Sequence, residues 1–173
     1  MNLPPEQRLH GLIAATHTPF KSDGSLNLAV VEAQCAHLLK SGVGTAFIGG
    51  TTGESASLTP EERLALTERW MAVARGTALR VVVHVGGNCL ADSATLAAQA
   101  GRLGAAAISA LAPSYFKPRT LDLLISCCQQ IAAAAPETLF SLIRSLKSGN
   151  FTPCLAFGAE GEPVAALPFV PVG

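Results

Sequence analysis

Short apolar runs alternate along this chain with segments whose apolar residues recur at helical spacing. The apolar runs begin near positions 12, 45, 80, 106 and 138, so that each interval has roughly the length of a βα unit. The run at 79–85 shows no polar alternation until His84, which is typical of a strand covered on both faces, as in parallel sheets. Consecutive parallel strands joined by helices form a doubly wound sheet or a barrel, so the sequence predicts an α/β fold.

Capping signals mark where the helices begin and end. Thr59, Pro60 and Glu62 supply a capping hydroxyl, a first-turn proline and a capping-box carboxylate ahead of one helix. Asn27 is the expected N-cap of the preceding helix, and Gly42 is its expected left-handed stop. The helical segments predicted in this way are about 27–41, 60–75, 91–103 and 120–135.

The alternation ends near Arg144. Beyond this residue, prolines and glycines interrupt an apolar stretch in which neither a helical nor a strand period survives. We therefore divide the chain into residues 1–140, which hold the βα units, and residues 141–173, an irregular tail without the pattern of a replacement strand. Because five unclosed parallel strands leave two sheet edges unpaired, we expect this arrangement to be poorly stable by itself.

The composition favours a soluble protein that binds a small molecule. Twelve basic residues balance twelve acidic ones without a run of like charge, which argues against a nucleic-acid or anionic-membrane surface. Pro4, Pro5 and Glu6 stand where a signal peptide needs an apolar stretch, and no later apolar run reaches membrane-spanning length. Five cysteines, an odd number without metal-ligand spacing, favour a reducing compartment. We expect a cytoplasmic protein without a metal site.

The stretch 47–55, with the sequence FIGGTTGES, passes abruptly from an apolar strand to glycines and hydroxyls. The carboxyl ends of strands collect the chemistry of βα folds, because loop amides and helix N-termini point there. Gly50 allows a tight turn, and Thr51 and Thr52 add two hydroxyl donors that suit a carboxylate. The alternative is that Thr51 merely caps a short turn, with Glu54 at capping-box spacing.

Several motifs occur in a recognisable order. Gly50-Thr51-Thr52-Gly53-Glu54 lies one βα unit behind residues 15–20 (ATHTPF) and is followed by 83–86 (VHVG), 112–118 (APSYFKP) and 131–136 (IAAAAP). Over about residues 9 to 140 the chain resembles the dihydrodipicolinate synthase and N-acetylneuraminate lyase family. Its motifs after the third and fourth strands are similar to those of animal lyases more than to those of the synthases.

The resemblance implies a partial (β/α)₈ TIM barrel of about four to five βα units from an aldolase that cleaves sialic acid to pyruvate and N-acetylmannosamine. In that family a lysine on the sixth strand forms a Schiff base with the substrate, and a tyrosine on the fifth strand moves the proton. Thr51 and Thr52 would hold the substrate carboxylate, with Gly50, Gly53 and Glu54 as the supporting loop. The family needs no cofactor, and its full-length members are homotetramers.

The resemblance stops where the catalytic residues should begin. Aligned without gaps, Ile143 stands in the place of the tyrosine, and the lysine-bearing strand would lie at or past Gly173. We therefore assign no catalytic residue and expect a shortened, inactive form of a lyase, from an alternative transcript, a frame change or an imperfect gene model. Lys147 in the tail has no sign of the burial that would activate it.

Two aromatic residues near the predicted site receive ordinary structural interpretations. His84 is expected to be a buried histidine with its hydrogen bonds satisfied, and not a catalytic base. Tyr115 matches a position where the synthases place a proton-relay tyrosine across a subunit interface, but a half-buried aromatic over the fourth strand is the simpler expectation. Trp70 is expected in the core behind the second strand.

Two further functions stay open on the sequence alone. One is a dihydrodipicolinate synthase-like or other pyruvate-dependent aldolase, which shares the fold and the keto-acid chemistry. The other is a non-catalytic, truncated subunit that binds an intact partner. The expected small-molecule ligand of a lyase or related aldolase is a keto acid or sialic acid, and a non-catalytic subunit need not bind one.

Overall fold

A computed structural model describes residues 9–143, 154–157 and 163–167. Its elements are β1 (Ile13–Ala15), α1 (Val30–Lys40), β2 (Thr45–Ile48), the 3₁₀ turn η2 (Ser55–Ser57), α2 (Pro60–Ala74), β3 (Arg80–His84), α3 (Leu90–Arg102), β4 (Ala107–Leu111), α4 (Leu121–Ala133), β5 (Phe140–Ile143), β6 (Cys154–Phe157) and β7 (Pro163–Leu167). The five strands and four helices predicted up to position 143 are all present.

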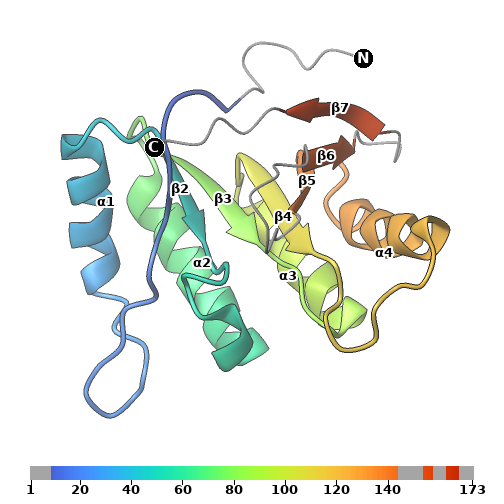
Figure 1. The fold of residues 1–173 in the computed structure, drawn as a ribbon. Helices are drawn as coiled ribbons and strands as arrows, with labels where there is room; N and C mark the ends of the chain where they lie inside the picture. Colours follow the sequence, from blue (N-terminus) through green and yellow to red (C-terminus); the bar gives the residue numbers. More distant parts are fainter. Residues whose placement is uncertain (1–8, 144–153, 158–162, 168–173) are drawn as a thin grey trace, which may run out of the picture.

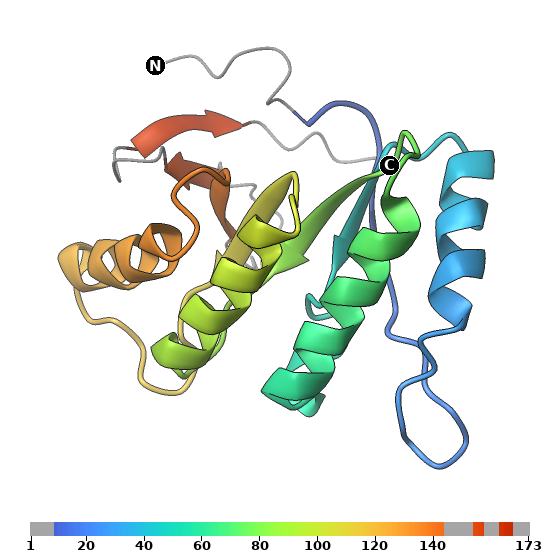
Figure 2. The ribbon, with the colours of Figure 1, turned by 180° about the vertical axis from the view of Figure 1, so that it is seen from behind.

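The strands form one sheet in chain order from β1 to β7 (Figure 1). Neighbouring strands from β1 to β5 pair in parallel, with register pairs such as Phe47↔Val82 and Ser109↔Ser141. All four helices lie on the same face of this sheet, as the view from behind shows (Figure 2). The predicted α/β class is confirmed, and helices on one face only are typical of a segment of a barrel and not of a doubly wound sheet.

The core lies between the sheet and the helices. Alternate strand residues point toward the helices, and Trp70 of α2, with none of its surface exposed, packs among them as predicted. The strand side chains of this core are Ala46, Ile48, Val81, Val83, Ile108, Ala110 and Phe140. The alternate residues of β3 and β4, such as Val82 and Ala107, are buried on the opposite face of the sheet and are not part of this core.

The helix boundaries follow the predicted caps in one case and not in another. Thr59 accepts a hydrogen bond from the Glu62 amide, and the Glu62 carboxylate accepts one from the Thr59 amide, so the capping box is confirmed. The prediction of Asn27 as an N-cap is wrong. Helix α1 begins at Val30, and its N-cap position is held by Ala29, whose side chain has no acceptor. Asn27 lies in the turn before the helix, where its carbonyl accepts from the Val30 amide and its amide donates to the Pro19 carbonyl.

The tail is also more regular than its sequence suggests. β6 pairs with β5, and β7 with β6, both antiparallel, so the expectation of no regular element after Arg144 is wrong for these residues. Runs of four and five residues are too short to display a period, and the outer edge of β5 offers unpaired backbone groups to them. Pro163 is the first residue of β7, where a missing amide is tolerated. The division into 1–140 and 141–173 stays a prediction, and Lys147 lies outside the described residues.

Replacing Thr59 by alanine should lower the free energy of unfolding by about 1 kcal/mol, because the Glu62 amide at the start of α2 loses the hydroxyl oxygen that accepts its hydrogen bond. Trp70 is the only tryptophan and is fully buried, so its fluorescence during urea unfolding reports the change. Thr59→Ser keeps the capping oxygen and should unfold at nearly the urea concentration of the original chain. Equal destabilisation by both substitutions would contradict the capping role.

Candidate functional site

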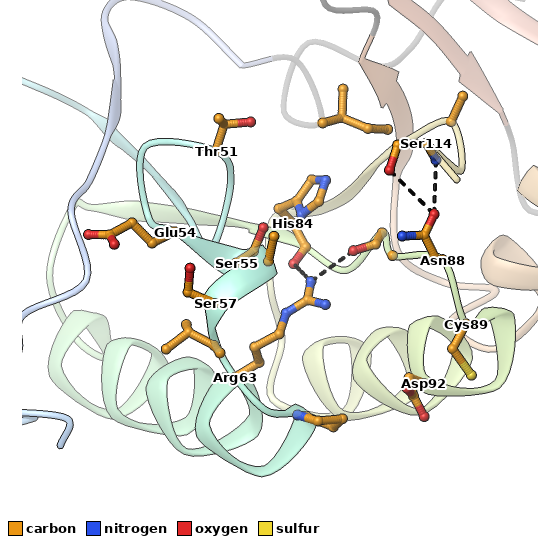
Figure 3. Close-up of a pocket in the computed structure, with 17 residues that line it drawn as sticks. Thr51, Glu54, Ser55, Ser57, Arg63, His84, Asn88, Cys89, Asp92 and Ser114 are labelled. Atoms are coloured by element: carbon orange, nitrogen blue, oxygen red, sulfur yellow. Dashed lines mark hydrogen bonds between the residues drawn. The ribbon is translucent and has the colours of Figure 1, made fainter. Parts of the chain in front are cut away.

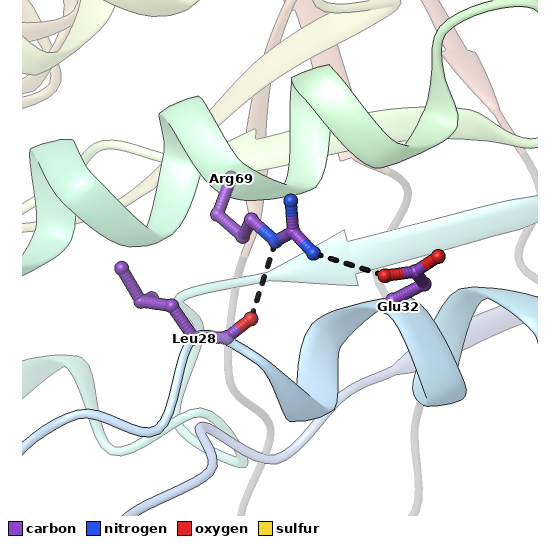
Figure 4. A network of polar contacts seen from close by, with 3 residues as sticks. All are labelled: Leu28, Glu32 and Arg69. Atoms are coloured by element: carbon purple, nitrogen blue, oxygen red, sulfur yellow. Dashed lines mark hydrogen bonds and ion pairs between the residues drawn. The ribbon is translucent and has the colours of Figure 1, made fainter.

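A cavity of about 540 Å³ opens at the carboxyl ends of β2, β3 and β4 (Figure 3). Three loops enclose it: the turn after β2 with η2, the loop between β3 and α3, and the start of the loop after β4. The polar side chains that line it come from Thr51, Glu54, Ser55, Ser57, Arg63, His84, Asn88, Asp92 and Ser114. Since parallel strands bring their carboxyl ends to one edge of the sheet, these loops meet as the sequence predicts.

The glycine-rich turn after β2 is folded back against the end of β1. A Cβ at Gly53 would lie 3.2 Å from the Thr16 carbonyl oxygen, and the Thr18 hydroxyl donates to the Gly53 carbonyl at 2.6 Å. A Cβ at Gly50 would overlap the Phe47 ring. These contacts leave no room for side chains, so both glycines are needed for the close approach of the turn to the sheet.

The two threonines of this turn point to different surroundings. Thr51 lines the cavity together with Glu54, whereas Thr52 is exposed and does not line it. Backbone bonds close the turn: the Glu54 amide donates to the Thr51 carbonyl at 3.0 Å. Glu54 itself adopts a left-handed φ of 55°, and no side-chain cap bond is found at η2. The alternative interpretation as a Thr51–Glu54 capping box is therefore wrong.

Arg63 is a site residue that the sequence analysis missed. One of its terminal nitrogens donates to the His84 carbonyl at 2.9 Å and to the Gly86 carbonyl at 3.1 Å, which joins α2 to the end of β3 (Figure 3). Burial lowers the pKa of the guanidinium, and the nearby Asp92 carboxylate opposes this shift. A signal was present: Arg63 precedes the buried residues Leu66 and Trp70 by three and seven positions, which puts a charge on the core face of the helix.

Asn88 is a second residue that the sequence did not reveal. Its side-chain oxygen accepts a hydrogen bond from the Ser114 amide at 3.0 Å (Figure 3) and a second one from the Tyr115 amide, also at 3.0 Å. Asn88 thereby joins the loop after β3 to the loop after β4. Tyr115 is 78% exposed and meets Phe116 edge to face, with ring centroids 4.8 Å apart. The expectation that Tyr115 is half-buried over the fourth strand is wrong, because Asn88 fixes its backbone in a loop that extends beyond the sheet.

His84 is buried as expected, with 5% of its surface exposed, but its ring is not satisfied. Neither ring nitrogen has a hydrogen bond of standard geometry with any described residue, although the Gly49 backbone lies near and favours protonation slightly. Burial, assisted by the charge of Arg63, lowers the pKa of His84 to about 4. The imidazole is therefore neutral at pH 7.

Sequence and structure comparisons agree on the origin of this arrangement. A family model described as "Dihydrodipicolinate synthetase family" matches residues 8–146. The chain belongs to this family. N-acetylneuraminate lyase A of Xenopus laevis is 46% identical over 135 residues, which are 78% of this chain and 44% of that protein. Human N-acetylneuraminate lyase is 39% identical over 137 residues, 79% of this chain and 43% of its own length.

Solved structures of the family have the same fold. N-acetylneuraminate lyase of Proteus mirabilis superposes with a TM-score of 0.75 at 41% identity, over 78% of this chain and 45% of that one. Dihydrodipicolinate synthase of Aquifex aeolicus gives a TM-score of 0.72 at 28% identity, with similar coverage of 78% and 44%. The chain thus spans about half the length, or less, of the relatives that it matches.

The described residues contain no group of three or more histidine, cysteine, aspartate or glutamate side chains placed to hold a metal ion. No helix in this part of the chain has both the length and the apolar composition needed to cross a membrane.

Gly86→Ala should destabilise the chain by about 1–3 kcal/mol, because the added methyl would overpack a rigid contact. Its Cβ would lie 2.9 Å from both the Ala110 Cα and the Leu111 amide nitrogen, which are backbone atoms of β4. Gly87→Ala is the matched control, since its Cβ would meet nothing closer than 3.7 Å. Urea unfolding followed by Trp70 fluorescence measures both, and a similar loss in the two variants would contradict the proposed contact.

The stability of the chain should fall as the pH is lowered from about 6.5 to about 4. In this window the unfolded state binds a proton at His84 and the folded state does not, which favours unfolding by roughly 3 kcal/mol when the window has been crossed. His84→Gln removes the titrating group and should show a correspondingly smaller loss over the same range. Parallel pH profiles of unfolding free energy for the two chains would contradict the burial of a neutral imidazole.

Proposed function

We propose that this chain is the substrate-carboxylate half of a sialic acid lyase, lacking the groups that form and use the Schiff base. The observation that carries the proposal is the position of the GTTGE turn: it lies at the carboxyl end of β2, with Thr51 facing a polar cavity. Identities of 39–47% to N-acetylneuraminate lyases, against 28–32% to solved dihydrodipicolinate synthases, favour the lyase branch.

A keto acid is the ligand class that suits this turn. Hydroxyl and backbone donors at the end of a parallel strand stabilise a carboxylate by charge-assisted hydrogen bonds. The solved structure of YagE from E. coli K12, which is 28% identical to this chain and superposes with a TM-score of 0.71, is described as a complex with pyruvate. In this proposal Thr51, on the wall of the cavity, and Thr52, next to it on the exposed side of the same turn, hold the carboxylate of pyruvate or of an open-chain sugar acid. Gly50, Gly53 and Glu54 shape the turn.

The chain's own lysines do not suit imine formation. A Schiff-base lysine must be deprotonated near neutral pH, which requires burial or a neighbouring positive charge. Lys21, Lys40 and Lys117, the lysines of the described part of the chain, are all exposed to solvent. In this proposal none of these lysines is the catalytic amine, and the chain has no proton-shuttling tyrosine. The full reaction needs the C-terminal half of a lyase.

The proposed function also suggests a cellular location and an oligomeric state. We propose a cytoplasmic location for an aldolase of this kind, and the family's homotetramer would apply to the complete enzyme. A dihydrodipicolinate synthase-like activity is the second candidate, favoured by TM-scores of 0.69–0.72 to solved synthases.

The chain alone should release no pyruvate from N-acetylneuraminate, and borohydride should trap no pyruvate adduct on it. Joining residues 9–139 to the C-terminal half of the Xenopus laevis lyase should restore cleavage, because the second half supplies the imine-forming amine. In this chimera, Thr51→Ala should raise the KM for N-acetylneuraminate by about tenfold, the loss of one hydrogen bond to a charged group. Thr51→Ser keeps the donor and should change the KM little.

Each arm of this experiment can fail separately. A borohydride-trapped adduct on the isolated chain, located by mass spectrometry, would show that it does carry an active amine. A folded chimera that condenses pyruvate with aspartate semialdehyde but leaves N-acetylneuraminate intact would favour the synthase candidate over the lyase.

A further inference from the structure

Three polar side chains stand side by side on neighbouring strands. The register pairs His84 of β3 with Ser109 of β4, and Ser109 with Ser141 of β5. Paired residues of parallel strands lie about 4.8 Å apart and point to the same face of a sheet. We call these three residues the polar row.

The polar row lies on the face of the sheet that the helices do not cover. The residues before it, Val83, Ile108 and Phe140, belong to the core between sheet and helices, and side chains alternate along a strand. The row therefore points into what would be the interior of a barrel. The Phe47 ring stands beside it, with its centroid 6.2 Å from that of the His84 ring.

The row has hydrogen-bonding capacity that the described part of the chain does not use. Ser109 is completely buried and its hydroxyl has no partner, and both ring nitrogens of His84 are buried without a standard hydrogen bond. Most buried polar atoms in native proteins have a partner, either in the protein or in an ordered water molecule. The two nitrogens of one imidazole point in different directions, and the Gly49 backbone lies near the ring. One ring nitrogen and the neighbouring Ser109 hydroxyl can therefore share a partner, which is not a side chain or backbone group of the described residues.

The chemistry of these groups restricts that partner. A neutral imidazole offers one donor and one acceptor, and each serine hydroxyl can both donate and accept. Because the pKa of His84 is lowered to about 4, the row carries no charge near neutral pH and has no particular affinity for an anion or a cation. Its complement is an uncharged group that donates and accepts at the same time.

We propose that the polar row of His84, Ser109 and Ser141 binds an O–H group, supplied by an ordered water molecule or by a hydroxyl of a polyhydroxy ligand. His84 also lines the cavity that Thr51 lines, so a ligand with its carboxylate at Thr51 has access to the row from the same cavity. The ligand source rests on the proposed function, whereas the water source does not.

The test is nuclear magnetic resonance of the full chain labelled with ¹³C and ¹⁵N in histidine and serine. We expect a water cross-peak to the His84 ring and the Ser109 methylene, and ring nitrogen shifts of a neutral, hydrogen-bonded imidazole. Ser109→Ala should remove or weaken this cross-peak. Ser57→Ala is the control: it lines the cavity, is exposed and lies outside the row, so the cross-peak should persist.

Two matched probes distinguish the sources of the O–H group. Glycerate and propionate both carry a carboxylate, but only glycerate carries hydroxyls. Shifts of the His84 ring by glycerate and not by propionate support a ligand hydroxyl, whereas a water cross-peak unaffected by either supports a bound water.

If Ser109→Ala does not fold, the spectra of the unsubstituted chain still test whether the polar row binds an O–H group. A folded chain, shown by buried Trp70 fluorescence, that gives no water cross-peak and no response to glycerate would overturn the proposal. If the chimera has no lyase activity but the water cross-peak is present, the proposed function fails and the polar row stands.

Discussion

The hydrogen bonds from Arg63 to the end of β3 hold together the edge of the sheet on which the cavity is built. Regular pairing between β3 and β4 ends with the Val85 amide, which donates to the Ser109 carbonyl at 2.7 Å. Just beyond, the chain must turn at Gly86 while pressed against the backbone of β4. The carbonyls of His84 and Gly86 need donors at this point, and a planar guanidinium supplies them from α2.

The position of Arg63 also determines the electrostatics of the cavity. A half-buried cation beside His84 disfavours a second positive charge, and desolvation acts in the same direction. The arginine therefore performs two tasks: it fixes the end of β3 and helps to keep the imidazole neutral. Asn88 extends the same rigid region to the next loop, because its single oxygen accepts from the backbone of two consecutive residues there.

Local signals in the sequence predicted most of the fold, and long-range contacts explain what they missed. The capping box at Thr59 and the continuous apolar run of β3 depend on neighbours in sequence, so they could be recognised directly. Arg63 and Asn88 bind groups 21 to 27 positions away, and only the parallel register brings these together. Asn27 is a residue type typical of N-caps, but an additional turn places the start of α1 at Val30 and the N-cap position at Ala29.

The direction of β6 limits what the tail can contribute to the cavity. Ten residues separate β5 from β6, fewer than the dozen or more that a crossover between parallel strands requires. β6 therefore pairs antiparallel to β5, and its carboxyl end lies at the edge of the sheet opposite to the cavity. In a barrel of parallel strands, the sixth strand presents its carboxyl end on the same side as the first five. β6 consequently cannot place a residue at its carboxyl end beside Thr51, and it does not replace the sixth strand of a lyase.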